Sequence, residues 1–106
     1  MLDFYKISDN EDNPEYPDEN LYIGSINWEE HEYINGFFAP IKKKKLLHYY
    51  NDLRFKSTDI KKLNSYVTNS IIKLMDDDAQ RVSVEKFYQI LEAAKKENMG
   101  IMVFCD

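Results

Sequence analysis

The sequence predicts an α+β fold, in which a small sheet formed by the N- and C-terminal strands is covered by about four helices. Each end of the chain is a short apolar segment that favours a strand, Leu2–Ile7 at the start and Ile101–Cys105 at the end. Between them, two longer segments place apolar residues three and four positions apart, the period of an amphipathic helix. We therefore expect the last strand to return beside the first. At 106 residues the chain is predicted to form a single domain, 1–106.

Two strands and a loop are predicted near the N-terminus. Leu2–Ile7 is rich in aromatic and β-favouring residues, which is typical of a strand. Residues 8–20 contain two prolines, six carboxylates and no aliphatic side chain, so this segment is predicted to be a solvated loop. Leu21–Ile26 is a second predicted strand, weakened by Gly24. At least two of the aromatic residues Tyr5, Tyr22 and Trp28 are expected in the core.

A short helix is predicted over Trp28–Ile34. Asn27 is a good N-cap for it, and acidic residues occupy its first turn, where the helix dipole favours anions. The pair Asn35-Gly36 predicts its end. The four lysines Lys42–Lys45, followed by Leu46–Tyr50, then favour a second helix, because lysine and leucine are good helix formers.

Two longer helices follow. Ser57 or Thr58 is expected to cap the first, whose apolar stripe is Ile60, Leu63, Val67, Ile71 and Leu74. The run Asp76–Asp78 predicts a break. Ser83 is expected to cap the last helix, which Asn98–Gly100 ends before the terminal strand. The predicted buried face of the last helix is Val84, Phe87, Tyr88, Leu91 and Ala94.

Charge is distributed unevenly along the chain. Residues 1–33 hold ten carboxylates and one cation, Lys6, a net charge of −9. Residues 34–106 hold 13 cations and nine carboxylates, a net charge of +4, and the two parts give the overall −5. A field of this kind steers partners more than it stabilises a fold. The acidic third therefore predicts a basic protein as the binding partner.

The candidate partner-binding residues lie in this acidic third. Aromatic side chains supply much of the binding energy at interfaces, and carboxylates around them supply steering. Tyr16, between Pro14 and Pro17, cannot easily reach a core and is the best aromatic candidate. A plain solvated loop is the alternative interpretation of the same segment. The predicted partner-binding residues are Asp12, Glu15, Tyr16, Asp18, Glu19, Glu29 and Glu30.

No catalytic, metal or cofactor site is predicted. Catalytic carboxylates need a rigid, partly buried setting, and these lie in a proline-bounded loop or on a short helix. Asp76–Asp78 lacks the alternating ligands, glycine and closing glutamate of a calcium loop. Two histidines without a cysteine pair make a poor metal site. A small hydrolase that uses His31 or His48 stays as an alternative function, and a non-catalytic regulatory adaptor is another.

Neither a nucleic acid nor a membrane is a predicted partner. Lys42–Lys45 is a short basic run in a chain with a pI near 5.0, so direct nucleic-acid binding is not predicted. A solvated face, pairing with the acidic loop and nucleic-acid contact are the interpretations that this run allows. The longest apolar run, Ile101–Cys105, is far too short to cross a bilayer, and no signal peptide is recognisable. We expect a cytoplasmic monomer or weak dimer without membrane contact.

The opening of the chain resembles that of small bacterial immunity proteins. The similar segments are Leu2–Ile7, Tyr16–Glu19 and Tyr22–Asn27, which lie within the first third of the sequence. Such proteins are encoded beside the toxins of polymorphic or contact-dependent growth inhibition systems. The resemblance implies a cytosolic antidote that binds a cognate toxin domain, in many cases a nuclease with a basic cleft, and blocks it. The family shares no fixed set of functional residues, so none is carried over.

Overall fold

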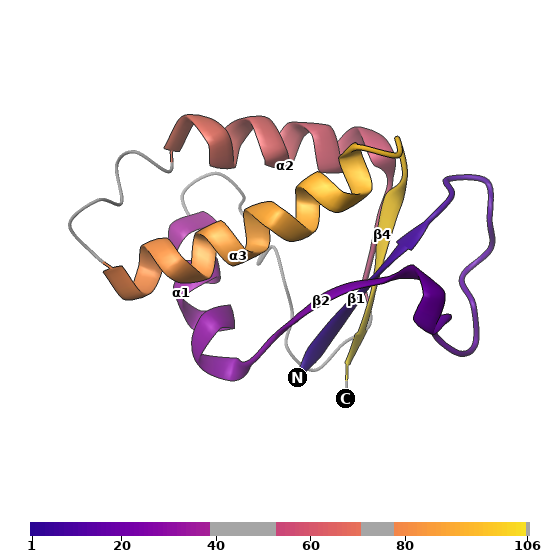
Figure 1. Cartoon of the computed structure of the whole chain (residues 1–106), viewed down its shortest axis with the longest axis horizontal. Coiled ribbons are helices and arrows are strands. Elements are labelled where there is room, and N and C mark those ends of the chain that lie inside the picture. The colour runs from indigo at the N-terminus through magenta and orange to yellow at the C-terminus, as the bar shows by residue number, and fades with distance from the viewer. Residues whose placement is uncertain (39–52, 71–77, 106) are drawn as a thin grey trace.

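A four-stranded antiparallel sheet with helices against one face forms the structure, which confirms the α+β class (Figure 1). The computed structural model describes residues 1–38, 53–70 and 78–105. The strand order is β2-β1-β4-β3. The strands are β1 (Leu2–Ile7), β2 (Tyr22–Ile26), β3 (Leu53–Phe55) and β4 (Gly100–Cys105). The helices are α1 (Trp28–Phe38), α2 (Ser57–Ser70) and α3 (Asp78–Lys95), with a short 3₁₀ helix, η1 (Glu19–Leu21).

The two terminal strands are neighbours at the centre of the sheet. β1 and β4 pair along their whole length, from Leu2 opposite Cys105 to Ile7 opposite Gly100. The N- and C-termini consequently lie close together (Figure 1). This confirms the predicted return of the last strand beside the first. The two ends of the described chain thus form adjacent strands, and the three α-helices lie between them in sequence.

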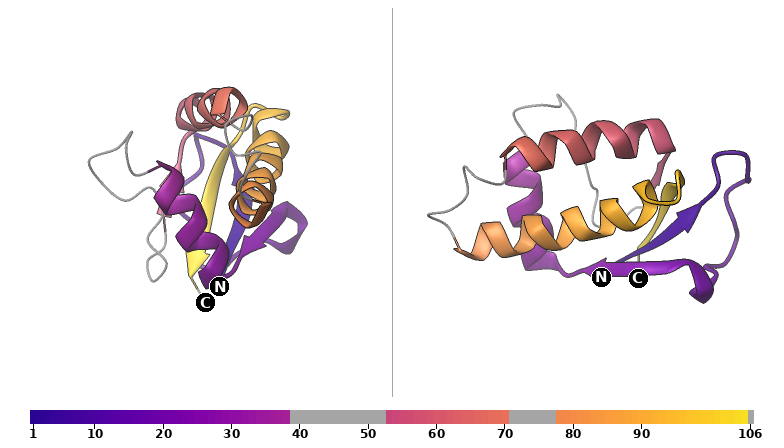
Figure 2. Two further views of the ribbon diagram at one scale, coloured as in Figure 1. Left: turned by 90° about the vertical axis from the view of Figure 1, so that its left-hand side faces the viewer. Right: turned by 45° about the horizontal axis from the view of Figure 1, so that its top comes forward.

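The three α-helices lie on the same side of the sheet (Figures 1 and 2). α2 and α3 pack against each other and against the sheet, and α1 packs on α3. The loop 8–20 projects from the opposite end of the molecule to α1 (Figure 2). The expected number of about four helices is slightly too high for the described residues. The predicted helix over Lys42–Tyr50 lies outside them, as do Ile71, Leu74, Asp76 and Asp77.

The core lies between the helices and the sheet. Phe4 of β1 and Phe87 of α3 are both essentially inaccessible, and their rings meet edge to face with centroids 6.2 Å apart. Within the described residues, the predicted stripe of α2 and the predicted face of α3 are buried, except that Tyr88 is only partly covered. The described residues of these two sets that are buried are Ile60, Leu63, Val67, Val84, Phe87, Leu91 and Ala94.

A polar cluster joins α2 to α3 beside this core. Asn64 is 2% exposed. Its Nδ2 donates to Glu92 Oε1 at 3.1 Å, and its Oδ1 accepts from Lys95 Nζ at 3.1 Å. Hydrogen bonds from Asn64 and Tyr88 lower the pKa of Glu92 below its ordinary value. The cluster fixes the two helices in register through groups that a hydrophobic pattern does not detect.

Two predictions about element boundaries are wrong, and one strand was not predicted. α1 continues through Asn35-Gly36 to Phe38, because its packing on α3 offsets the helix-breaking tendency of glycine, about 1 kcal/mol. α3 begins at Asp78, five residues before the predicted cap. Ser83 lies inside the helix, where its hydroxyl donates to the Ala79 carbonyl at 3.0 Å. β3 was not predicted, since a three-residue strand has too little pattern to recognise.

The expected burial of the N-terminal aromatic residues is also wrong. Tyr22 is 47% exposed and Trp28 is 48% exposed. Tyr5 is half-buried on the side of β1 that faces away from the helices. For Tyr5 the reason is strand geometry. Neighbouring residues of β1 point to opposite faces, and Leu2 and Phe4 already fill the face that packs against the helices.

Candidate functional site

The structure separates the predicted partner-binding residues into two groups. Residues 11–20, which include Asp12, Glu15, Tyr16, Asp18 and Glu19, are all exposed, and Tyr16 is 75% exposed. Glu29 and Glu30 instead follow β2, at the start of α1. Since strands rise about 3.3 Å per residue, the five residues of β2 separate the groups by roughly 16 Å. The acidic residues therefore form two patches along one edge of the molecule.

The loop is anchored to the junction between β3 and α2. Arg54 Nη2 donates to the Ser8 carbonyl at 2.9 Å, and Arg54 Nη1 donates to Asn13 Oδ1 at 2.7 Å. The Ser57 amide donates to Asp9 Oδ1 at 2.8 Å, and the Ser57 hydroxyl donates to Asp9 Oδ2. Ser57 thus donates its hydroxyl instead of capping α2 as predicted. A carboxylate from the loop stands at the N-terminus of α2, where the helix dipole favours it.

Asp9 was not singled out from the sequence, because nothing in a loop of six carboxylates marks the one that serves the fold. The hydrogen bonds from the Ser57 hydroxyl and amide lower the pKa of Asp9 below its ordinary value. The segment 8–13 is therefore held at Ser8, Asp9 and Asn13, and Asp12 lies within it. The later acidic residues lie between Asn13 and η1 or in η1 itself, which contacts β1. Both ends of the loop thus have a defined position relative to the sheet.

We expect Asp9→Ala to lower the urea midpoint of unfolding at pH 7. The lowered folded-state pKa means that ionised Asp9 stabilises the fold above the unfolded pKa of about 3.9, and that this contribution is lost as the pH falls through the folded-state pKa. The gap between the wild type and Asp9→Ala should consequently shrink below about pH 4. Urea titrations at several pH values measure this gap. Asp12→Ala, in the same loop, is the matched control, and an equal loss in both variants would contradict the anchoring role.

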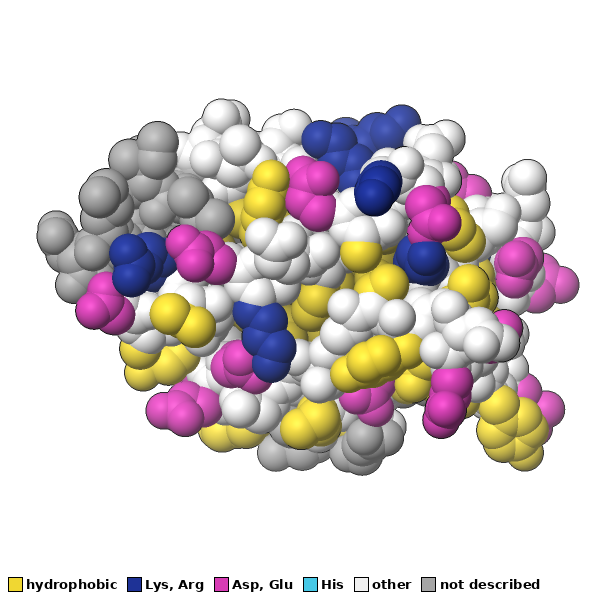
Figure 3. Space-filling model, viewed as in Figure 1, with side chains coloured by type: hydrophobic (Ala, Val, Ile, Leu, Met, Phe, Trp, Pro, Cys, Tyr) yellow, Lys and Arg dark blue, Asp and Glu magenta, His cyan; other side chains and the backbone are white. Residues whose placement is uncertain are grey.

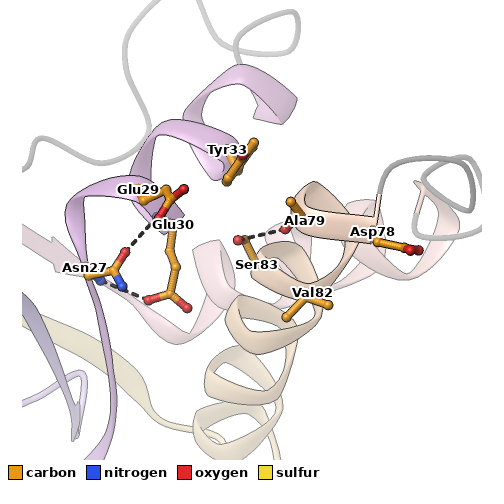
Figure 4. Close-up of a pocket in the computed structure, with 8 residues that line it drawn as sticks. All are labelled: Asn27, Glu29, Glu30, Tyr33, Asp78, Ala79, Val82 and Ser83. Atoms are coloured by element: carbon orange, nitrogen blue, oxygen red, sulfur yellow. Dashed lines mark hydrogen bonds between the residues drawn. The ribbon is translucent and has the colours of Figure 1, made fainter.

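Glu30 combines its charge with a structural role. Its Oε1 accepts from the Asn27 amide at 3.0 Å, and its own amide donates to Asn27 Oδ1 at 2.9 Å, which forms a capping box at the start of α1 (Figure 4). Lys86 Nζ on α3 also lies 3.0 Å from Glu30 Oε1. Of the predicted helix pair, Glu29 is the exposed member. Glu30 mainly holds α1 against α3.

A shallow groove of about 390 Å³ runs between α1 and α3 (Figure 4). Glu29 and Tyr33 line it from α1, and Asp78 and Val82 line it from α3. Val82 is 57% exposed. The groove brings Asp78, which the sequence placed in an inter-helix break, beside the acidic start of α1. The acidic residues Glu29, Glu30 and Asp78 therefore border a concave surface.

A second hollow lies on the face of the sheet that the helices leave open. Its volume is about 330 Å³, and it is lined by Asp3, Tyr5, Glu19 and Tyr22. Only Glu19 among these was a predicted partner-binding residue. Asp3, Tyr5 and Tyr22 come together because β1 and β2 pair antiparallel, with Tyr5 opposite Tyr22. The hollow adjoins η1 and so belongs to the loop end of the molecule.

The histidines contribute little to the surface that is described. His31 is 3% exposed and stacks on Trp28 with ring centroids 5.7 Å apart. It is a packed residue of α1. His48 lies outside the described residues. The described ranges contain no group of three or more His, Cys, Asp or Glu side chains arranged to hold a metal ion.

Charges of both signs are found across the surface of the described residues, and some of them form ion pairs, but each sign also has a local concentration. Lysine and arginine side chains gather over α2, at the top of the view, and Asp and Glu side chains are prominent at the loop end (Figure 3). The α2 lysines include Lys61 and Lys62, which are exposed. The uneven charge of the sequence is therefore partly reflected in space, as carboxylates concentrated at the loop end and lysines over α2 (Figure 3). A basic partner approaching the loop end would meet the attractive side of this field.

Comparison with family models, with curated proteins and with solved structures found no match to this chain. Within the residues that the structure describes, no helix has both the length and the apolar character needed to span a membrane.

Proposed function

We propose that this chain is an immunity protein that binds and blocks a basic toxin domain, a nuclease in particular, through its acidic loop end. The supporting observation is the anchored loop. The loop that carries five of the predicted partner-binding residues is tied to Arg54 and Ser57 through Ser8, Asp9 and Asn13, and Tyr16, further along the loop, is 75% exposed. Charge held in a defined place favours fast, oriented association with a surface of opposite sign.

The proposed mechanism is steering followed by occlusion. Nuclease domains bind phosphates with lysine and arginine side chains, and clustered carboxylates offer the same groups an alternative anionic partner. Carboxylates at the rim raise the association rate, while an aromatic side chain at the centre supplies contact energy. The loop carries both kinds of residue without placing either in the core. A toxin cleft covered in this way is closed to its substrate, with no chemistry required of the inhibitor.

Neutralising four loop carboxylates tests the proposal. In Asp12→Asn/Glu15→Gln/Asp18→Asn/Glu19→Gln, we expect association with the basic domain encoded by the adjacent gene to slow about tenfold at low salt, with a flatter salt dependence. The Asp18→Asn change keeps a side-chain oxygen that can accept from the Asn20 amide, as Asp18 Oδ1 does, so folding should be intact. Stopped-flow kinetics at several salt concentrations measure the effect, which should vanish at about 1 M salt, where the Debye length is ~3 Å.

The matched control removes the same amount of charge elsewhere. Glu32, Asp78 and Glu85 are exposed carboxylates away from the loop, and Glu97, also exposed, already pairs with Lys6. Their quadruple amide variant should slow association far less. Equal slowing in both variants would show that only net charge matters. Unchanged rates and affinity in the loop variant would place the interface elsewhere, around Lys42–Lys45 in particular, and an adjacent gene without a basic domain would also count against the proposal.

A further inference from the structure

The face of the sheet opposite the described helices carries acidic and aromatic side chains close together. β1 alternates, so that Leu2 and Phe4 enter the core while Asp3 and Tyr5 point to the opposite face. On that face lies the hollow of about 330 Å³ described above. Its walls come from β1, β2 and η1, three elements that the pairing of β1 with β2 brings together.

Aromatic rings form one wall of the hollow in a fixed arrangement. Tyr22 meets Tyr5 edge to face, with centroids 5.5 Å apart and an interplanar angle of 62°. Tyr5 in turn meets Phe104 of β4 at 5.5 Å and 83°. The three rings form a row across β2, β1 and β4, which restricts their rotation. Tyr22 nevertheless remains 47% exposed, so part of this ordered aromatic surface faces solvent.

Carboxylates from two separate elements stand beside these rings. Asp3 projects from β1, two residues before Tyr5, and Glu19 begins η1. η1 is held in place by Asp18, whose Oδ1 accepts from the Asn20 amide at 3.0 Å and whose carbonyl accepts from the Leu21 amide at 2.9 Å. Glu19 is therefore positioned by local structure. The charge that the described lining residues bring to the hollow is negative on both sides.

This combination recognises a planar cation. Tyrosine ring faces attract a cation through the ring quadrupole, and carboxylates accept its N–H groups in charge-assisted hydrogen bonds. A guanidinium uses both kinds of group at once, because it stacks on rings and presents a fork of donors to carboxylates. We propose that the hollow formed by Asp3, Tyr5, Glu19 and Tyr22 binds an arginine side chain of the basic partner. This deepens the proposed function, on which it rests, by naming a contact on the partner.

Charge complementarity favours this occupant over a second copy of the chain. Two copies meeting through this face would bring Asp3 and Glu19 of one against the same carboxylates of the other, which is unfavourable without intervening cations. A basic protein brings the opposite sign. The hollow also adjoins the loop through η1, so one partner can contact both. The loop supplies steering, and the hollow receives one cationic side chain.

The peptide acetyl-Gly-Arg-Gly-amide is the probe for the first test. We expect its titration into the ¹⁵N-labelled full chain to give saturable shift changes at the backbone amides of residues 3–5 and 19–22, with a dissociation constant in the millimolar range. The same peptide with neutral, isosteric citrulline should give none. Equal changes with citrulline, or changes centred on the groove between α1 and α3, would overturn the proposal. Equal affinity for the lysine peptide would overturn the assignment to arginine.

Variants of the hollow provide the second test. Tyr22→Leu should weaken the arginine peptide about two- to fivefold, whereas Tyr22→Phe, which keeps the ring, should bind like the wild type. Glu19→Gln should also weaken binding, while Glu29→Gln, an exposed carboxylate at the start of α1, should not. If Tyr22→Leu and Tyr22→Phe weaken binding equally, the ring face is not the recognition element. If Tyr22→Leu fails to fold, the pair Glu19→Gln and Glu29→Gln decides the outcome, and equal binding by these two variants would overturn the proposal.

The two proposals fail in different ways. If loop neutralisation slows association with the basic domain but arginine peptides do not bind the hollow, the arginine site is wrong and the proposed function stands. If the arginine peptide binds as expected but loop neutralisation leaves the association kinetics unchanged, the hollow is a cation site and the proposed interface is wrong. The affinity of the Tyr22→Leu and Tyr22→Phe variants for the basic partner tests the two proposals together. A loss of affinity in Tyr22→Leu but not in Tyr22→Phe supports both the proposed function and the arginine site.

Discussion

Phe87→Ala is expected to lower the free energy of unfolding by about 3–5 kcal/mol, the usual cost of emptying a buried aromatic site. Phe87 is 1% exposed, and its ring packs edge to face on Phe4 at a centroid distance of 6.2 Å. The substitution removes both the buried area and this contact between α3 and β1. At about 4 °C per kcal/mol for a chain of this size, the melting temperature should fall by roughly 12–20 °C. Thermal unfolding followed by circular dichroism measures the change.

Val82→Ala is the matched control, because it lies on the same helix and is 57% exposed. An exposed substitution of this kind is expected to change stability by no more than about 0.5 kcal/mol. A similar loss in both variants would indicate general helix destabilisation rather than an emptied core site. An unchanged melting temperature for Phe87→Ala would show that α3 presents a different face to the sheet.

Gly100→Ala is expected to cost about 3 kcal/mol, at the upper end of the usual range for overpacking. A Cβ at this position would lie 2.2 Å from the Phe55 carbonyl oxygen and 3.2 Å from Asp9 Oδ1. The first of these atoms belongs to the backbone of β3, so relief of the clash requires β3 to move away from β4. The same movement disturbs the contact between Asp9 and Ser57 that anchors the loop. A fall of roughly 12 °C in melting temperature should accompany faster proteolysis of the loop.

Gly24→Ala is the comparison for this variant. Its Cβ would meet only the Ile90 side chain, at 2.8 Å and 3.0 Å, and that side chain can rotate. The positive φ of Gly24, 153°, adds backbone strain, so this variant should also lose stability, but less than Gly100→Ala. If Gly100→Ala were as stable as the wild type, the close approach of β3 to the start of β4 would be wrong. If only the loop became sensitive to protease, the cost would lie at Asp9 rather than in the sheet.

The sequence was most informative about elements that have a clear apolar pattern. The apolar ends of the chain predicted β1 and β4 and their pairing, and the stripe through Ile60, Leu63 and Val67 predicted α2. These predictions were confirmed because the burial of a continuous apolar face is the main contribution to the stability of a helix or strand within a fold. Helix ends were less predictable. Asn35-Gly36 is a stop signal in isolation, but α1 passes through it since contacts with α3 outweigh a local preference.

The candidate surface was predicted in charge but not in shape. Exposure of residues 11–20, including Tyr16, follows from their composition. The separation of Glu29 and Glu30 from the loop does not, because the length of β2 and the direction of α1 decide it. Likewise Asp9 and Asp12 are alike as residues. Only the approach of Ser57 across the fold makes Asp9 an anchor and leaves Asp12 on the surface.

The sequence by itself determined the α+β class, the pairing of the terminal strands, the core faces of α2 and α3, and an exposed acidic loop. The class, the core faces and the loop depend on composition or on a short-range period that the residues carry wherever they are placed, and the strand pairing was inferred from the order of elements along the chain. The tertiary structure alone decided that Tyr5 and Tyr22 face away from the core and meet Asp3 and Glu19 in one hollow. Their proximity comes from antiparallel pairing between residues far apart along the chain. Such contacts have no local signature, because they are set by which strand faces are already filled and by where the loop is held.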